Sequence, residues 1–272
     1  MSIIADCHLH SYHSGDSSAP MEAMIQQAIS LGLKEICFTE HQDIDYVYHE
    51  NETPGCYEIN TDSYLYELIG YKEQYRSQIE VSFGVELGMQ AHIARKLAAY
   101  SKNHDFDFII ASSHLCNQKD PYFPDFFEGR SEEDAYHEYF QYINECLRSY
   151  MNFDVYGHLD YILRYGPNKN ANFVYADYRD DIDTILKTLI DNEKGIEINS
   201  SGFAYGLGQP HPCKDIIQRY KELGGEIITI GSDAHEPSRI AYDYHTVGEL
   251  LTDIGFRYYC VFKGRLPEYF KI

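Results

Sequence analysis

Short apolar segments alternate with longer amphipathic segments along nearly the whole chain. The apolar segments are rich in β-branched and aromatic residues and predict strands at 3–7, 35–39, 81–85, 108–112, 154–157, 195–199, 226–230 and 258–262. The amphipathic segments predict helices at 20–31, 61–77, 90–102, 131–150, 176–192, 212–223 and 246–254. A β-α-β-α order of this kind gives an α/β fold of parallel strands with right-handed crossovers.

The number of β-α units distinguishes an open sheet from a barrel. Seven or eight units in 272 residues favour a closed or nearly closed barrel over a six-stranded open sheet. Such a barrel needs about 250 residues, so we expect residues 1–272 to form a single barrel domain. Two long loops, 42–60 and 115–130, are either substrate walls or lids, or loops without a function.

The predicted helices carry signals at their ends. Ser131, with Asp134 three residues later, resembles a capping box in which Asp replaces the usual Glu. Gly32, Gly224 and Gly255 follow helical segments at the place where a helix commonly ends in a positive φ.

Charge and composition exclude several classes of protein. The chain has 22 Lys and Arg against 43 Asp and Glu, a net charge of −21, so we expect no binding to nucleic acid or to an anionic membrane. No segment reaches the ~20 apolar residues of a membrane helix, and residues 1–7 do not resemble a signal peptide. The seven cysteines are scattered and form no C-x-x-C pair, which favours free thiols and a cytoplasmic protein.

Polar residues gather at the C-terminal ends of the predicted strands. In chain order they are His8 and His10, Glu40 and His41, Glu86, His114, His158 and Asp160, Asn199 and Ser201, and Ser232, Asp233 and His235. Six of the 13 histidines lie there, although windows covering roughly 8% of the chain would hold about one by chance. Because barrel enzymes build their sites at this face, we expect these side chains to surround one site.

The residue types at this face are those of a metal centre. His8-x-His10 and Asp233-x-His235 each place two side chains on one face, because side chains alternate along a strand. Imidazoles with carboxylates suit Zn, Mn or Fe, and Glu86 could bridge two ions. At about three to four ligands per ion, nine candidates predict two or three ions; they are His8, His10, Asp16, His41, Glu86, His114, His158, Asp233 and His235.

For several other residues the sequence leaves two interpretations open. Asp16 is either a turn residue or a ligand, while Asp43, Asp45 and Asp160 either orient a histidine or are solvated. Arg164 either forms a surface ion pair or clamps a phosphate through two hydrogen bonds. The other histidines are interpreted as ordinary surface or core residues: His13, His49, His92, His104, His137, His211 and His245.

The charge of such a site favours a particular kind of substrate. Three ions would bring roughly +6, and the carboxylates of Asp16, Glu86 and Asp233 would return about −3. A positive site inside an acidic protein favours a small anionic group such as a phosphate and disfavours a long polyanion.

One ordered set of motifs spans nearly the whole chain: His8-x-His10, Asp16, Thr39-Glu-His41, Gly84-Val-Glu86, Ser113-His114, Gly157-His158 and Gly231-Ser-Asp-Ala-His235. This set resembles the PHP family (polymerase and histidinol phosphatase). The resemblance implies a distorted seven-stranded (β/α) barrel with about three metal ions at the strand C-termini. It also implies that His8, His10, Glu86 and Asp233 bind one ion, Glu86, His114 and His158 a second, and Asp16, His41 and His235 a third.

Three further stretches point to one branch of that family: 157–164, 195–202 and 206–208. They resemble the histidinol-phosphatase branch, which implies that Arg164 contacts phosphate. The chain departs from the branch at one place, because Ala204 stands where the branch usually has a second phosphate-binding arginine. Arg239 and Lys169 are the candidates to replace it.

The resemblance implies metal-dependent hydrolysis of a phosphomonoester, most simply L-histidinol phosphate in histidine biosynthesis. In this hypothesis Glu86, His41 and Asp233 are catalytic, and Arg164 binds the substrate phosphate. The alternatives are a phosphoesterase for another small phosphate ester or nucleotide, and a non-catalytic metal- or phosphate-binding regulator. An amidohydrolase-type barrel also begins with His-x-His, but it usually bridges its metals with a strand-end Lys, and no predicted strand here ends in Lys.

Overall fold

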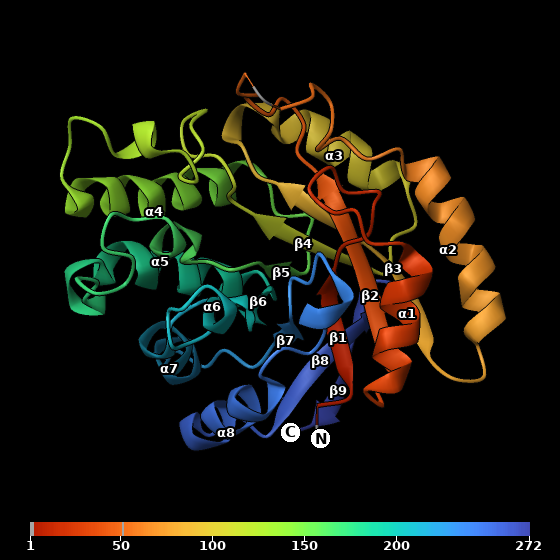
Figure 1. Ribbon diagram of the computed structural model, residues 1–272. Coiled ribbons are helices and arrows are strands. Elements are labelled where there is room, and N and C mark those ends of the chain that lie inside the picture. Colours follow the sequence, from red (N-terminus) through yellow and green to blue (C-terminus); the bar gives the residue numbers. More distant parts are fainter. Residues whose placement is uncertain (1–2, 51) are drawn as a thin grey trace.

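Seven parallel strands form one sheet, in which the strands follow the order of the chain (Figure 1). The computed structural model describes residues 3–50 and 52–272. The strands are β1 (Ala5–Leu9), β2 (Glu35–Gln42), β3 (Glu80–Gly88), β4 (Phe108–Ser112), β5 (Val155–Tyr156), β6 (Gly195–Asn199) and β7 (Ile228–Gly231). The first seven predicted strands are thereby confirmed, with shifts at their ends.

The sheet closes into a barrel beside the C-terminal end of β1. Just beyond β7, the Asp233 N–H donates to the carbonyl of His8, and the His10 N–H donates to the carbonyl of Ala234, both at 2.9 Å. Leu9 and Ala234 form a parallel bridge at the same place. This closure brings the His-x-His pair of β1 next to Asp233, although the two segments lie at opposite ends of the chain.

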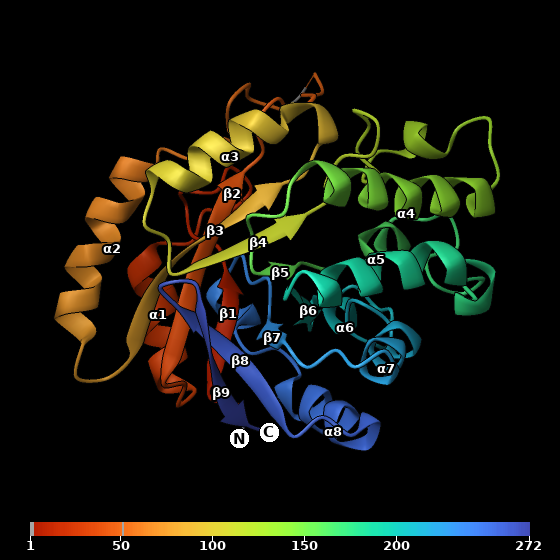
Figure 2. The same cartoon turned by 180° about the vertical axis from the view of Figure 1, so that it is seen from behind.

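Helices cover the outside of the barrel (Figures 1 and 2). The longer ones are α1 (Met21–Ser30), α2 (Thr61–Tyr75), α3 (Ala94–Asn103), α4 (Glu132–Ser149), α5 (Arg179–Asp191), α7 (Lys214–Glu222) and α8 (Tyr244–Ile254), close to the predicted bounds. Shorter elements are α6 (Ser201–Ala204) and the 3₁₀ turns η1 (Ala91–Ile93), η2 (Pro124–Phe127), η3 (Tyr161–Arg164), η4 (Tyr175–Asp177) and η5 (Pro237–Arg239). α5 shows the packing rule, since its residues at i, i+3, i+4 and i+7 from Ile182 are all buried.

The helix ends follow the signals in the sequence. Gly32, Gly224 and Gly255 have φ values of 81°, 93° and 100°. The Ser131 side chain caps α4 by accepting from the Asp134 N–H (3.0 Å). The Asp134 carboxylate accepts from the Ser131 hydroxyl (2.7 Å), whereas a full capping box would have it accept from the Ser131 N–H.

The eighth predicted strand, 258–262, lies outside the barrel sheet. It forms β8 (Tyr258–Lys263), which pairs with β9 (Leu266–Lys271) in a separate antiparallel hairpin. The sequence did not predict β9, because most of its residues are exposed and it contains Pro267, which lacks an N–H for a ladder. The barrel therefore has seven units.

The barrel strands are buried along almost their whole length, and their apolar side chains join one continuous core with the inner faces of the helices. Within residues 3–50 and 52–272, no helix is long and apolar enough to cross a membrane. All seven cysteines are free thiols, as expected. Several ionisable side chains are nevertheless fully buried among the strands: Asp6, His8, His10, Glu40, Glu86 and Glu197. Burial of this many ionisable groups costs free energy unless they pair with one another or bind a ligand.

Candidate metal centre

A cavity of about 880 Å³ opens at the C-terminal ends of the barrel strands. The loop 42–60 lines it with Tyr46 and Tyr57, among others, and the loop 115–130 lines it with Asp120 and Phe123. Both long loops are therefore walls of the cavity, which was one of the two interpretations of their length.

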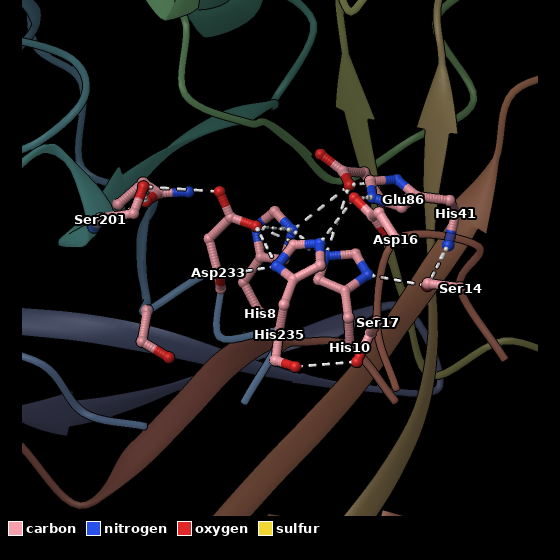
Figure 3. Close-up of polar contacts among 12 residues, drawn as sticks. His8, His10, Ser14, Asp16, Ser17, His41, Glu86, Ser201, Asp233 and His235 are labelled. Carbon is pink, nitrogen blue, oxygen red and sulfur yellow. Dashed lines mark hydrogen bonds and ion pairs between the residues drawn. The ribbon is translucent and has the colours of Figure 1, made fainter. Parts of the chain in front are cut away.

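Glu86 lies at the centre of a cluster of imidazoles (Figure 3). Its Oε1 lies 2.8 Å from His158 Nε2 and 3.2 Å from His114 Nε2. Its Oε2 lies 3.0 Å from His41 Nδ1 and 3.4 Å from His8 Nε2. One carboxylate thus contacts imidazoles from β1, from β2 and from the segments that follow β4 and β5. This is possible because β3 lies in the middle of the five strands β1 to β5.

The other predicted ligands extend the cluster toward the mouth of the cavity. Asp16 Oδ2 lies 3.0 Å from His235 Nε2 and 3.4 Å from His41 Nε2. Asp233 Oδ1 lies 3.5 Å from His10 Nε2. All nine candidates for metal binding therefore meet at one face, including Asp16, for which the sequence left a turn residue as the alternative.

Among residues 3–50 and 52–272, three sets of side chains have ligand atoms within 4.8 Å of one another. They are His8, His10 and Asp233; His41, Glu86 and His114; and His10, His41 and His235. The first set falls within the ligand set that the family resemblance implied for one ion. The second contains His41 where His158 was implied, and the third contains His10 where Asp16 was implied. The assignment of ligands to individual ions thus stays a prediction.

The arrangement of the ring nitrogens and carboxylate oxygens is better explained by bound cations than by hydrogen bonds among these atoms. Glu86 Oε2, His41 Nδ1 and His235 Nε2 are buried and have no hydrogen-bond partner, although each lies near other members of the cluster. Buried polar atoms are normally paired. Atoms that converge without hydrogen-bond geometry are expected where a shared cation binds between them.

The carboxylates of the cluster remain charged. Burial raises the pKa of the Glu86 carboxyl, but the surrounding imidazoles outweigh burial and hold this pKa well below its usual value. The same balance lowers the pKa of Asp16 and of Asp233. Conversely, burial lowers the pKa of His8 and His41, and nearby carboxylates outweigh it and raise both pKa values well above normal. The cluster therefore attracts positive charge, as protons or as metal ions.

In three histidines of the cluster, Nδ1 pairs with a side chain that is not one of the nine candidate ligands. The pairs are His8 with Glu197 (2.6 Å), His114 with Asp43 (2.7 Å) and His10 with Ser14 (3.0 Å). A bond of this kind fixes the tautomer and the ring orientation of a metal-binding histidine, leaving Nε2 to face the ion. Asp43 therefore orients a histidine, which was one of its two predicted roles.

Sequence reasoning did not single out Glu197 or Ser14. Glu197 stands at an inward position of β6, and a charged residue there, within an apolar strand, is a signal that could have been used. Ser14 also donates to the buried Glu40 and accepts from the His41 N–H (3.1 Å), contacts that only the folded loop creates.

The structure also decides the other open interpretations. Asp160 accepts from the N–H of Cys213 (2.7 Å) and pairs with Nδ1 of His211, which is a buried histidine, as expected for a core residue. Asp45 is exposed and pairs with the exposed His92 (2.8 Å), and neither residue lines the cavity.

Arg164 is buried in the cavity wall rather than paired at the surface. Its Nη2 donates to Ser201 Oγ (2.6 Å) and lies 3.4 Å from Asp233 Oδ2. The guanidinium carbon lies 4.0 Å from the ring centroid of Tyr205. Nε has no hydrogen-bond partner. A buried arginine with an unpaired N–H beside the candidate metal ligands is suited to an anion.

Ala204, at the place of the arginine usual in the branch, lines the same cavity. The two candidates to replace that arginine differ in position. Lys169 donates to the carbonyl of Tyr205 (2.7 Å) and is not among the residues that line the cavity, whereas Arg239 lines it. The Arg239 guanidinium is half exposed and pairs with Glu236 (3.3 Å).

A seven-stranded parallel barrel with imidazoles and carboxylates converging at its strand C-termini defines a class of metal-binding (β/α) barrels. The family model of the PHP domain matches residues 6–201, and the chain belongs to this family. It is 30% identical over 261 residues to the histidinol-phosphatase of Lactococcus lactis, covering 95% of this chain and 94% of the relative.

Two further comparisons extend over the whole length. The chain is 31% identical to a Clostridium acetobutylicum protein named "Probable histidinol-phosphatase", over 98% of this chain and 100% of that one. The crystal structure of the Lactococcus lactis histidinol phosphate phosphatase, complexed with Zn, L-histidinol and phosphate, superposes with a TM-score of 0.87 at 28% identity. The match covers 97% of this chain and 98% of that one. The distorted barrel expected from the resemblance is therefore confirmed.

Proposed function

We propose that this protein is a metal-dependent phosphomonoesterase that hydrolyses L-histidinol phosphate to L-histidinol and phosphate in histidine biosynthesis. The observation that carries the proposal is the convergence of nine potential ligands beside a buried, incompletely paired Arg164. The likeness to histidinol-phosphatases from end to end supports the choice of substrate. L-histidinol and phosphate, which the similar crystal structure contains, are the two products of this reaction.

We assign about three divalent ions to the cluster. Zn is the first choice because the Lactococcus lactis structure contains it, and Mn and Fe accept the same ligand types. Their ligands would be His8, His10, Asp16, His41, Glu86, His114, His158, Asp233 and His235. When bound, such ions lower the pKa of water and polarise phosphoryl oxygens.

The chain's own residues have distinct tasks in this proposal. Glu86 holds His41 and His8 near one carboxylate oxygen and His158 and His114 near the other. His41 lies between Glu86 and Asp16 and, as a ligand, would help to hold an ion that could stabilise the leaving alkoxide. Asp233 joins the cluster to Arg164, whose remaining N–H groups neutralise charge that builds on the phosphoryl oxygens.

Arg164→Ala should lower kcat/KM for phosphomonoesters by ~10-fold or more, because a charge-assisted contact to phosphate is lost. Arg164→Lys keeps the charge but not the planar fork, and should recover only part of the loss. Arg239→Ala is the comparison within the same cavity and should cost less, because Glu236 already pairs that guanidinium. Steady-state kinetics measure all three, and an unchanged rate in Arg164→Ala would remove Arg164 from the phosphate site.

The cavity wall also complements the organic part of L-histidinol phosphate, which carries an amine and an imidazole. Asp120 is buried in this wall and accepts from the Tyr46 hydroxyl (2.6 Å) and from the Tyr122 N–H (2.7 Å). Its neighbours in the lining include Tyr122 and Phe123. A carboxylate among aromatic rings suits a flat, cationic group.

Asp120→Asn should therefore raise KM for L-histidinol phosphate by ~10-fold, since a hydrogen bond to a charged group is worth about 1.5–3 kcal/mol. Hydrolysis of p-nitrophenyl phosphate, which has no cationic group, should change less than about twofold. Asp125→Asn is the matched control, because Asp125 is an exposed carboxylate of the same loop outside the cavity lining. Equal effects on both substrates would contradict the assignment.

Phosphate release by the Zn- or Mn-loaded protein tests the proposed reaction. We expect kcat/KM of ~10⁴ M⁻¹s⁻¹ or more for L-histidinol phosphate, and much lower values for p-nitrophenyl phosphate and a mononucleotide. Slow hydrolysis of all three would support a phosphoesterase but reject L-histidinol phosphate as its substrate. Rapid hydrolysis of the mononucleotide alone would establish the alternative small phosphate ester.

A further inference from the structure

One continuous chain of buried hydrogen bonds joins the metal cluster to the anion-binding arginine. The His8 Nδ1–H donates to Glu197 Oε1 (2.6 Å), and Glu197 Oε2 accepts from Asn199 Nδ2 (3.1 Å). Asn199 Oδ1 accepts from the Ser201 hydroxyl (2.6 Å), and Ser201 Oγ accepts from Arg164 Nη2 (2.6 Å). The path is consistent with a single hydroxyl hydrogen on Ser201, because the hydroxyl donates to Asn199 at the shorter distance (2.6 Å, against 3.4 Å to Asp233 Oδ2) and accepts from Arg164.

The backbone of β6 makes this chain possible. Glu197 and Asn199 lie two residues apart on one strand and so face the same side. Ser201 begins α6, one residue after the strand ends, and its N–H also donates to Asn199 Oδ1 (3.0 Å). Two bonds from Ser201 to one amide oxygen fix both the Asn199 amide and the Ser201 rotamer.

Neighbouring strands leave room for the chain by carrying glycine. A Cβ at Gly231 would collide with Glu197 Oε1 and with the Cβ of His8. A Cβ at Gly157 would collide with Ser112 and Ile110 and lie 3.4 Å from Glu197 Oε2. Both glycines therefore have a packing reason: Glu197 and His8 occupy the space of a side chain at Gly231, and Ser112 and Ile110 occupy it at Gly157.

We propose that Glu197, Asn199 and Ser201 are positioning residues that hold Arg164 at a fixed place relative to the metal ligand His8. The inference rests on the proposed function, in which Arg164 binds phosphate. Ser201 is the residue of this hydrogen-bonded chain that contacts Arg164 directly. Its hydroxyl accepts the shortest hydrogen bond that Arg164 donates. Because Ala204 stands in place of a second arginine, Arg164 binds the phosphate either alone or together with the exposed Arg239. The position of Arg164 therefore affects phosphate affinity more than it would in a site with two such arginines.

The chain offers a matched pair of variants for the test. Ser201→Ala deletes the hydroxyl that Arg164 contacts and leaves the backbone bond to Asn199 intact. Ser200→Ala deletes the neighbouring hydroxyl, which is equally buried but has no hydrogen-bond partner. Both variants remove one oxygen from the same turn, so a general effect of truncation on packing would appear in both.

The experiment measures binding of inorganic phosphate to the metal-loaded protein by calorimetry, together with metal content. We expect Ser201→Ala to weaken phosphate binding about 5- to 10-fold, with full metal content, and Ser200→Ala to change it less than about twofold. If Ser201 acts through Arg164, the double variant Ser201→Ala/Arg164→Ala should bind phosphate no more weakly than Arg164→Ala alone.

Two kinds of result would overturn the inference, and they differ in what else they reject. Equal phosphate affinity of Ser201→Ala and Ser200→Ala, or full additivity with Arg164→Ala, would reject the positioning role alone. Unchanged affinity in Arg164→Ala would reject that role together with the assignment of Arg164 to phosphate. Neither result depends on whether L-histidinol phosphate is the substrate, because the probe is phosphate itself.

Discussion

Replacing Glu86 by Ala should lower kcat/KM for L-histidinol phosphate by about 10³-fold or more. The side chain contacts four imidazoles within 3.4 Å, and it is the carboxylate that joins those of β1 and β2 to those that follow β4 and β5. Without it, the four imidazoles lose the anion that they share, and the charge that favours cations at the centre of the cluster falls. Steady-state kinetics, metal content and thermal unfolding should be measured together.

The control for this variant lies on the same strand. Glu80 begins β3 at the other end of the barrel, where it is exposed and pairs with Lys72 (3.6 Å). Glu80→Ala should leave kcat/KM within about twofold, since a surface ion pair contributes little. Glu86→Gln keeps the volume and removes the charge, so it should resemble Glu86→Ala in activity while unfolding at nearly the wild-type temperature. More than a third of wild-type activity in Glu86→Ala would refute the metal mechanism.

The fold and the innermost part of the site could be predicted because both depend on local patterns. Seven strands followed the apolar segments, and strand ends of a parallel barrel necessarily meet at one face. This geometry is enough to bring Glu86 of β3 and His158, which follows β5, within hydrogen-bond distance. The count of seven or eight units stayed open at the predicted strand 258–262, which lies outside the barrel sheet, because apolar alternation does not distinguish a strand that joins the barrel from one that pairs elsewhere.

The outer partners of the histidines could not be predicted, because they depend on register and on loop conformation. Glu197 reaches His8 only because β7, between β6 and β1, carries Gly231 beside it. Asp120 enters the cavity wall through the path of a loop whose sequence shows only that it is long and aromatic. Pairings between residues 189 positions apart leave no periodic trace in a single sequence.

Removing bound metal with a chelator should lower turnover by more than about 10²-fold, and adding Zn or Mn back should restore it. The metal-free protein should also unfold at a lower temperature, because ions that bind only the folded state stabilise it by mass action. Metal loss that lowers the unfolding temperature of a protein with no turnover on any phosphate ester would establish the non-catalytic regulator instead. Turnover that persists with no metal bound would reject both.

The pKa values of the cluster predict how metal uptake depends on pH. In the metal-free protein, nearby carboxylates outweigh burial and raise the pKa of His8 and His41 well above normal, which favours the protonated form of both imidazoles. A metal ion binds the neutral imidazole and must displace these protons. Zn affinity should therefore rise as the pH rises from 6 to 8, by about tenfold per pH unit for each proton released, and fall on acidification. Calorimetric titration in buffers of different ionisation enthalpy counts the protons. A proton count of zero with a pH-independent affinity would show that His8 and His41 are already neutral before metal binds, and the charge balance derived for the cluster would be wrong.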